Sequence, residues 1–446
     1  MQSNLNALGY HELTPIQAQC LPEIINKKDV IAQAKTGSGK TATFGIGLLH
    51  SLKPQIFQTQ ALVICPTREL TEQVCNELRR LARAVPNTKI ITLCGGKAMA
   101  GQLASLEKNP HIVVGTPGRL LQHLEKNTLD VSQLATLVLD EADRMLDMGF
   151  LNDIEQVIAK TPSSRQTLLF SATYPDDIKK VSRSVQKNPV DIKVESVHQE
   201  TQIQQHFYAL KTHSKEQALL AVLKHYQPTS AVVFCNRKQQ CDDLTQFLGQ
   251  NGISAKSLHG DLEQNDRDRV LVQFTNNSCR ILVATDVAAR GLDIKELPLV
   301  INMDLPHEPE VYLHRIGRTG RAGSVGTAVS LFEPADTPKV IAIENVSKQA
   351  LPINDLSTLN AAQPFNSDAT MVTLCINGGR KDKLRAGDIL GALTAKQTIA
   401  GDAIGKIDRF DRLTYVAVDR AVRDQALKLL NNGKVKGRQF KARVVK

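Results

Sequence analysis

The stretch Ala34-Lys35-Thr36-Gly37-Ser38-Gly39-Lys40-Thr41 decides the fold of this 446-residue chain. It follows an apolar run at 30–32 and precedes a segment with a helical pattern. A strand, a glycine-bearing loop that ends in Lys-Thr and a helix together indicate a phosphate-binding loop, because backbone N–H groups and the helix N-terminus then face phosphate oxygens. In such a loop Lys40 reaches the outer phosphates and the Thr41 hydroxyl ligates magnesium. An ordinary glycine turn is the alternative, since Ala34 stands where a first glycine is usual.

Short apolar runs alternate with helical patterns along most of the chain, which indicates parallel sheets covered by helices on both faces. In the first part these runs lie at 30–32, 61–65, 90–94, 112–114, 137–139 and 168–170. A second series lies at 231–235, 281–284, 299–303 and 328–332. Ligands of such sheets bind at the carboxyl ends of the strands, where the polar motifs of this chain also fall. The sequence therefore predicts an α/β fold with two tandem parallel-sheet domains.

An acidic pair, Asp140 and Glu141, directly follows the apolar run at 137–139. Asp140 can hold magnesium through its water shell. Glu141 can orient an attacking water, because phosphoryl transfer needs mainly positioning and charge neutralisation. A solvated acidic helix start is the alternative, but the loop at 34–41 favours a nucleotide site. The next run, 144–150, is expected to provide core packing and a turn.

Together, the loop at 34–41 and Asp140-Glu141-Ala142-Asp143 resemble the DEAD-box family of RNA-dependent ATPases, and the resemblance extends in order over residues 5–350. In that family the matching residues of the first domain read adenine (Gln17), contact the RNA backbone (Arg68, Gly96, Thr116 and Arg119) and couple hydrolysis to strand separation (Ser171 and Thr173). The residue types suit these tasks. An amide carries a donor and an acceptor for the adenine edge, while glycine and arginine suit phosphates.

The second series of strands carries His314-Arg315-Ile316-Gly317-Arg318-Thr319-Gly320-Arg321. Arg318 and Arg321 lie three residues apart, so on one helical turn they would face the same way and clamp an outer phosphate as an arginine finger within one chain. By the same resemblance, His314 is a coupling residue and Asp293 lies on the nucleotide side. RNA contacts are implied for Gly260, Thr285 and Arg290.

The family usually places an aromatic residue well upstream of its glutamine, where it stacks on adenine. Only 16 residues precede Gln17 here. We therefore expect either that the native start lies further upstream or that stacking on the base is weakened.

The expected organisation is a first RecA-like domain at 1–190, a linker at 191–201, a second RecA-like domain at 202–351, a linker at 352–369 and a small α+β domain at 370–446. The net charge is +10, and residues 371–446 hold 17 Lys and Arg against 7 Asp and Glu, which accounts for the whole surplus. A basic appendage on a balanced body indicates a polyanion-binding domain.

The order βαββαβ in this basic segment resembles an RNA-recognition motif, a fold that stacks bases on aromatic residues of its central strands. The expected third strand keeps only Tyr415, so RNA binding is expected to shift to exposed basic residues: Arg380, Lys381, Lys383, Arg385, Lys434, Lys436 and Arg438. A DEAD-box core with such a tail is similar to a bacterial subgroup that grips a hairpin of large-subunit ribosomal RNA. The phrase Asn377-Gly378-Gly379 is among those that carry this similarity.

The eight cysteines form no C-x-x-C pair, and several lie in strand-like runs, which favours buried thiols in a reducing cytoplasm. No apolar run reaches the roughly 20 residues of a membrane span. The resemblance implies a cytoplasmic, monomeric helicase that uses ATP and Mg²⁺ and acts on ribosomal RNA in pre-ribosomal particles. Two alternatives remain open: a DNA-directed helicase, since backbone contacts alone do not exclude DNA, and an RNA clamp with little hydrolysis or unwinding.

Overall fold

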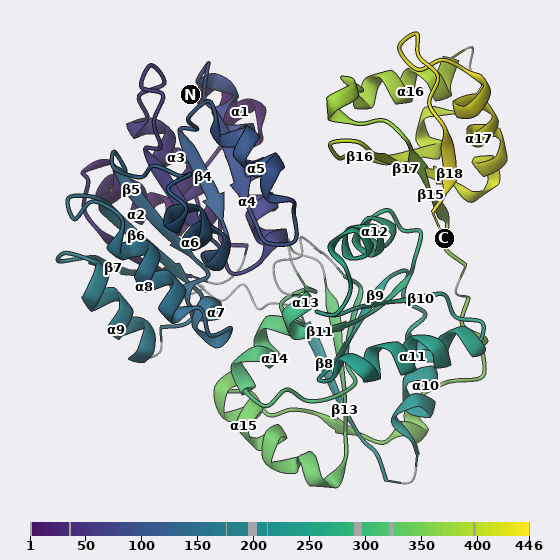
Figure 1. The fold of residues 1–446 in the computed structure, drawn as a ribbon. Helices are drawn as coiled ribbons and strands as arrows, with labels where there is room; N and C mark the ends of the chain where they lie inside the picture. The colour runs from purple at the N-terminus through teal and green to yellow at the C-terminus, as the bar shows by residue number, and fades with distance from the viewer. Residues whose placement is uncertain are drawn as a thin grey trace. The chain divides into compact units, whose positions relative to one another are not determined.

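The computed structural model describes residues 2–34, 37–174, 176–194, 203–211, 213–289, 297–320, 325–366, 368–395 and 398–445. These residues fall into two compact units, one before residue 195 and one after residue 202 (Figure 1). Each unit contains a seven-stranded sheet, and the second unit also contains a four-stranded sheet near the C-terminus.

The first unit is built on a parallel sheet with the strand order β3-β4-β2-β5-β6-β1-β7. Its strands are β1 (Val30–Gln33), β2 (Ala61–Ile64), β3 (Ile90–Leu93), β4 (Ile112–Gly115), β5 (Thr136–Asp140), β6 (Gln166–Ser171) and β7 (Val190–Lys193). Because both faces of the sheet are covered, the central strands are apolar at nearly every position rather than at alternate ones.

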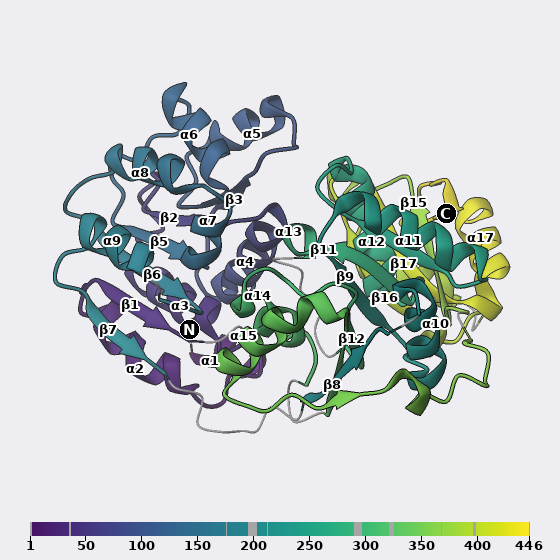
Figure 2. The same ribbon diagram turned by 90° about the horizontal axis from the view of Figure 1, so that it is seen from below.

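Two hydrophobic cores lie on opposite faces of this sheet. Helices α2, α3 and α4 contribute to one core, and α6, α8 and α9 contribute to the other, as Figure 2 shows. The helices of the unit are α1 (Gln2–Ala7), α2 (Pro15–Ile25), α3 (Lys40–Ser51), α4 (Arg68–Leu81), α5 (Met99–Leu106), α6 (Pro117–Glu125), α7 (Ala142–Asp147), α8 (Leu151–Ala159) and α9 (Asp176–Val185). Thr67 marks the start of α4 as its N-cap, with its side chain accepting a hydrogen bond from Leu70 N.

The second unit repeats the architecture with the parallel strand order β10-β11-β9-β12-β13-β8-β14. The strands are β8 (Ile203–Ala209), β9 (Ala231–Cys235), β10 (Ala255–Leu258), β11 (Ile281–Thr285), β12 (Leu299–Asn302), β13 (Gly326–Phe332) and β14 (Ile353–Asn354). The helices are α10 (Lys215–Tyr226), α11 (Lys238–Gln250), α12 (Gln264–Thr275), α13 (Asp286–Ala289), α14 (Pro309–Ile316) and α15 (Thr337–Ser347). Helices α10 and α11 cover one face, and α14 and α15 cover the other.

The C-terminal part of the second unit is an antiparallel sheet with the order β16-β17-β15-β18. It consists of β15 (Met371–Ile376), α16 (Ala386–Thr394), β16 (Ile404–Arg409), β17 (Thr414–Asp419), α17 (Arg423–Asn432) and β18 (Ala442–Val444). Both helices pack on one face of this sheet, around Leu374, Ile389 and Leu430. The predicted fold, two tandem parallel-sheet domains followed by a small α+β domain with the order βαββαβ, is confirmed.

The strand boundaries differ from the expected ones at the edges of the sheets. Strand β7 pairs in parallel with β1, so 191–193 belong to the first sheet rather than to the linker expected at 191–201. Strand β14 likewise lies within the linker expected at 352–369 and pairs with β8. All eight cysteines are buried and free, which confirms the prediction for those in strand-like runs and extends it to the others.

Candidate functional site

The predicted phosphate loop lies at the carboxyl end of β1, and α3 starts at Lys40. Gly37 and Gly39 adopt left-handed backbone angles, with φ of 90° and 95°, which a residue with a Cβ rarely adopts. Ala34 has no such angle, and its N–H donates to Ser171 O at 3.1 Å, so an alanine fits where a glycine is usual. Lys40 is buried, and its Nζ donates to Ala34 O at 2.7 Å, across the mouth of the loop. Lys35 and Thr36 lie outside the described residues.

The segment before α2 contacts this loop. Thr14 Oγ1 donates to Ser38 O at 2.8 Å, and the Gln17 amide accepts from Thr14 N at 2.9 Å while its Nε2 donates to Gly39 O at 3.4 Å. A Cβ on Gly39 would lie 2.7 Å from the same Nε2. The predicted adenine reader is therefore held against the loop, and a glycine is required for that close approach.

The acidic pair lies at the carboxyl end of β5, beside the loop. Asp140 is fully buried, and this burial, together with the charge of Glu141, raises its pKa to about 7, although Lys40 acts in the opposite direction. Glu141 has a left-handed backbone, with φ of 53°, which turns the chain sharply from the strand into α7. Thr41, in the first turn of α3, follows the lysine that interacts with Asp140.

Asp143 is the last residue of the quartet Asp140-Glu141-Ala142-Asp143. It connects the acidic residues to the segment that follows β6. Its Oδ2 accepts hydrogen bonds from Ala172 N at 3.2 Å and from Thr173 N and Thr173 Oγ1, both at 2.9 Å. Asp143 N lies 3.4 Å from the hydroxyl oxygen of Ser171. The predicted coupling residues Ser171 and Thr173 are thus bonded to the acidic motif itself. Sequence reasoning gave Asp143 no role, although its place in the quartet was a signal.

The residues predicted to contact RNA in the first domain follow β2, β3 and β4. Arg68 packs over Gly96, whose φ is 74°, so closely that a Cβ there would lie 2.0 Å from Arg68 Nη1. Arg119 Nη1 donates to Lys97 O at 3.0 Å, and Thr116 N donates to Leu93 O at 3.1 Å. Because β2, β3 and β4 run parallel, these groups lie at the carboxyl ends of the strands, on the same side of the sheet as the phosphate loop.

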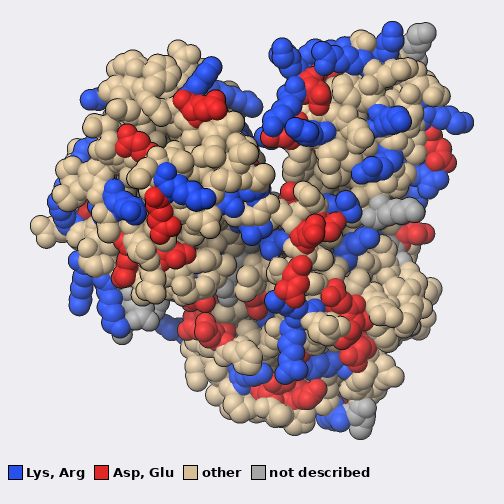
Figure 3. Space-filling model, viewed as in Figure 1, with Lys and Arg blue, Asp and Glu red and all other residues tan. Residues whose placement is uncertain are grey.

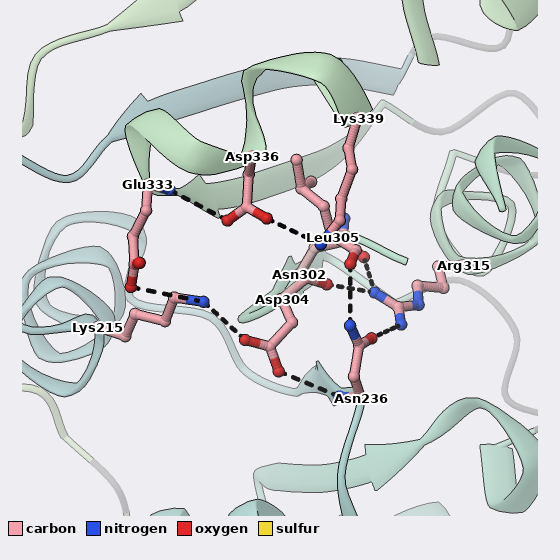
Figure 4. Close-up of polar contacts among 9 residues, drawn as sticks. All are labelled: Lys215, Asn236, Asn302, Asp304, Leu305, Arg315, Glu333, Asp336 and Lys339. Carbon is pink, nitrogen blue, oxygen red and sulfur yellow. Dashed lines mark hydrogen bonds and ion pairs between the residues drawn. The ribbon is translucent and has the colours of Figure 1, made fainter. Parts of the chain in front are cut away.

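In the second unit, Arg315 connects the ends of three neighbouring strands, β11, β9 and β12, and Figure 4 shows its contacts at the last two. Its guanidinium makes five hydrogen bonds: to both carboxylate oxygens of Asp286 (2.6 and 2.7 Å), to Asn302 Oδ1 (3.1 Å), to Asp304 O (2.6 Å) and to Asn236 Oδ1 (2.9 Å). It also lies 5.1 Å from the centre of the Phe234 ring. Sequence reasoning did not single out Arg315, although it lies in the arginine motif.

The neighbouring Asp304 is part of the same network. Burial would raise its pKa, but a hydrogen bond from Lys215 at 2.7 Å and another from Asn236 N at 3.1 Å bring the pKa below its ordinary value. An ionised Asp304 therefore ties α10 to the ends of β9 and β12.

Arg318 does not lie on the helical turn expected for it, because α14 ends at Ile316 and Gly317 caps it, while the other half of the expected pair, Arg321, lies outside the described residues. Gly320, with φ of 65°, continues the turn. Arg318 is buried, and its carbonyl accepts from Leu297 N at 3.2 Å. His314 is half-buried, Thr285 ends β11, and Gly260 is exposed. Three further predicted residues lie outside the described residues: Arg290, Asp293 and Arg321.

The seven basic residues predicted as RNA contacts in the C-terminal domain are all exposed: Arg380, Lys381, Lys383, Arg385, Lys434, Lys436 and Arg438. The two groups of predicted contacts meet where Lys436 Nζ donates to Lys383 O at 3.1 Å. Figure 3 shows Lys and Arg side chains gathered along one border of this domain. Gly378 and Gly379 allow close packing there, since a Cβ on them would lie 2.4 Å from the Phe440 ring and 2.3 Å from Phe410 O.

Within the second unit, the open face of the same sheet is covered at its two central strands, β15 and β17. Cys375 and Tyr415, a cross-strand pair of β15 and β17, cluster with Val272 of α12. Thr373 forms hydrogen bonds with Asn276 at 3.3 Å and with Ser278 at 2.6 Å. Tyr415 is therefore a packing residue in this structure and does not offer a free stacking surface.

Comparison with known proteins identifies three matching regions. Residues 14–181 match the DEAD/DEAH box helicase family, 214–323 match the helicase conserved C-terminal domain, and 373–444 match the DbpA RNA binding domain. The chain is 52% identical over 450 residues to the ATP-dependent RNA helicase DbpA of Escherichia coli (strain K12), covering 100% of this chain and 97% of that relative. It is 39% identical over 459 residues to DbpA of Bacillus subtilis (strain 168), covering 98% and 95%.

A solved structure of S. cerevisiae Dbp5 bound to RNA and ADP BeF3 superimposes with a TM-score of 0.73 at 27% identity, covering 79% of this chain and 93% of that chain. Within the described part of the chain, no helix has both the length and the apolar character needed to cross a membrane.

Proposed function

Because this chain belongs to the DEAD/DEAH box helicase family and is an ATP-dependent RNA helicase of the DbpA type, we propose that its ATP site is built from the loop at 34–41, Asp140 and Glu141, and that its C-terminal domain targets a hairpin of large-subunit ribosomal RNA. One observation supports the ATP site above the others. The loop, the acidic quartet and the segment after β6 meet at the carboxyl ends of the strands of one sheet, where hydrogen bonds and the Lys40–Asp140 charge interaction connect them.

In this proposal the loop N–H groups and Lys40 hold the phosphates, and Gln17 reads adenine. Thr41 and Asp140 offer a hydroxyl and a carboxylate, the oxygen ligands that Mg²⁺ prefers, so their chemistry fits this ion. Magnesium, when bound, neutralises phosphate charge. Glu141 orients the attacking water. From the second helicase domain, Arg318 and Arg321 clamp the outer phosphate as an arginine finger, and Asp293 lies on the nucleotide side.

RNA binding in the core is assigned to Arg68, Gly96, Thr116 and Arg119 in the first domain and to Gly260, Thr285 and Arg290 in the second. Ser171, Thr173 and His314 couple hydrolysis to the separation of a short duplex. ATP and RNA each favour the same closed state of the core, so each tightens binding of the other.

The target of the C-terminal domain is proposed from its charge and surface. Residues 371–446 carry the whole basic surplus of the chain, and the seven basic residues are exposed. The covered sheet face favours recognition through these residues rather than through stacking on Tyr415. We further propose that the protein acts as a monomer in the cytoplasm, on pre-ribosomal particles.

The decisive experiment measures ATPase activity at matched salt with three nucleic acids: an rRNA fragment containing the hairpin, an unrelated structured RNA, and DNA of the same sequence. A K434Q/R438Q variant should lose the preference for the hairpin RNA, and its salt dependence of binding should fall by about one unit of slope per lost phosphate contact. The control K428Q removes an exposed lysine of α17 and should behave as the wild type.

If all three nucleic acids stimulate the wild type and K434Q/R438Q equally, the proposed ribosomal target is refuted. Stimulation by DNA would favour the DNA-directed alternative. An ATPase rate unchanged by E141Q would favour a clamp that does not depend on hydrolysis.

A further inference from the structure

One buried ion pair at the site has no part in the roles assigned above. Arg144 is among the largest fully buried side chains of the described residues, and its Nη1 lies 2.9 Å from Glu141 Oε2. The exposed fractions of the two side chains are 2% and 10%. Arg144 lies in the first half of α7, three residues after Glu141, so both side chains project from the same turn.

Stability alone explains this pair poorly. A buried ion pair is costly to desolvate, and apolar residues of similar volume are often as stable or more stable. An apolar side chain would suit the position, because Arg144 itself is only 2% exposed. A charged side chain at Arg144 therefore calls for another reason, and its hydrogen-bonded partner suggests one.

Glu141 also has an uncommon backbone conformation. With φ of 53°, Glu141 occupies a region that residues with a Cβ avoid and that the surrounding structure must maintain. The neighbouring acids have other partners: Asp143 is bonded to Ala172 and Thr173, and Asp140 interacts with Lys40. The Glu141 carboxylate accepts its hydrogen bond from the Arg144 guanidinium.

We propose that Arg144 is a positioning residue for ATP hydrolysis: by holding Oε2 of Glu141, it fixes the carboxylate so that Oε1 is presented to the attacking water. This inference rests on the proposed role of Glu141 and adds no step to the reaction. The guanidinium of Arg144 contacts the Glu141 carboxylate, and its proposed effect passes through that contact. It acts by limiting the orientations of a carboxylate whose placement determines the approach of the water.

The test is a double-mutant cycle in the full-length protein at saturating RNA, with R144M, R144K, E141Q and E141Q/R144M. R144M should lower kcat about 10- to 100-fold, the range typical of residues that orient a reactive group, while KM for ATP changes less than about twofold. R144K, which keeps a cation, should recover part of the loss. In the E141Q background, R144M should change kcat less than about threefold, since the group it orients is already impaired.

The matched control is R165Q, which removes another arginine of the first unit. Arg165 directly precedes β6, at the amino ends of the strands and away from the site, and it donates to the carbonyls of Pro162 and Val185. Its kcat should stay within about twofold of the wild type. Thermal melting monitored by circular dichroism verifies that each variant is folded, and if R144M fails to fold, the cycle is completed with R144K.

Three results would overturn the inference. A folded R144M with unchanged kcat would show that Arg144 does not position Glu141. An equal loss in the wild-type and E141Q backgrounds would show that it acts independently of Glu141. An E141Q variant with normal kcat would refute the proposed role of Glu141 and the inference with it, and this single variant distinguishes the two failures.

Discussion

Replacing Arg315 by methionine tests whether the stability of the second helicase domain depends on one guanidinium. Arg315 is 2% exposed and uses all five of its N–H donors. Methionine fills similar space, so the main loss is electrostatic. The carboxylate of Asp286, 21% exposed, and the fully buried Asn302 lose their partner.

The magnitude follows from what is left behind. Removing one partner of a buried ion pair costs about 3–5 kcal/mol, because the other charge remains buried and uncompensated. For a unit of about 150–250 residues, 1 kcal/mol shifts Tm by about 2–4 °C. R315M should therefore lower the transition of the second unit by about 6–20 °C. R315K should recover less than half of this, since one ammonium cannot replace a planar fork with five donors.

The assay is differential scanning calorimetry with far-UV circular dichroism, which suits a chain without tryptophan. The control R423M removes an arginine of the same unit whose side chain is 43% exposed and paired with Asp424, and it should shift Tm little. Adding D286N to R315M should restore part of the stability, because no carboxylate is then left unpaired. A loss below about 1 kcal/mol for R315M, or full recovery in R315K, would refute the reasoning.

Three further predictions concern the first domain. G96A should raise KM for RNA, because its Cβ would displace Arg68 and its left-handed backbone costs about 1–2 kcal/mol, whereas G101A, with no atom within 4 Å of the added Cβ, should bind RNA normally. At limiting Mg²⁺, ATPase activity should rise with pH through about 7, since burial raises the pKa of Asp140 to that value and only the ionised carboxylate attracts the cation; excess Mg²⁺ should move the midpoint lower. D143N should reduce duplex separation more than ATP hydrolysis, measured side by side, because Asp143 holds the segment after β6.

The central strands could be predicted from the sequence because they are buried on both faces and therefore read as continuous apolar runs. Several strands at or next to the sheet edges could not, although the edge strand β3, with three of its four residues buried, was predicted. Strand β7 buries only Ile192 among its four residues, and β10 buries only Leu258. Strand β8 mixes Gln and His with its two buried residues. A strand with a solvated side has few apolar residues, and four-residue segments are too short for an alternating pattern to be recognised.

Sequence patterns single out residues that stand in motifs, but they give no role to the buried Arg144 and Arg315, for a related reason. A sequence pattern does not show which charged residue is buried, so Arg144 is included in a run expected to provide packing and a turn, and Arg315 receives no role beside Arg318. Whether a charge is buried depends on which carboxylate the fold brings to it, and that depends on turns. The left-handed turn at Glu141 is the clearest example.

That turn separates three adjacent acids into three environments. Asp140 ends the strand beside Lys40, Glu141 turns back to Arg144, and Asp143 reaches the segment after β6. The carboxylates still repel one another, since the charge of Glu141 raises the pKa of Asp140, but each has a partner of its own. Separate partners allow each carboxylate to have a different role. The role of each acid therefore depends more on the side chain or backbone group that it contacts than on its position in the motif.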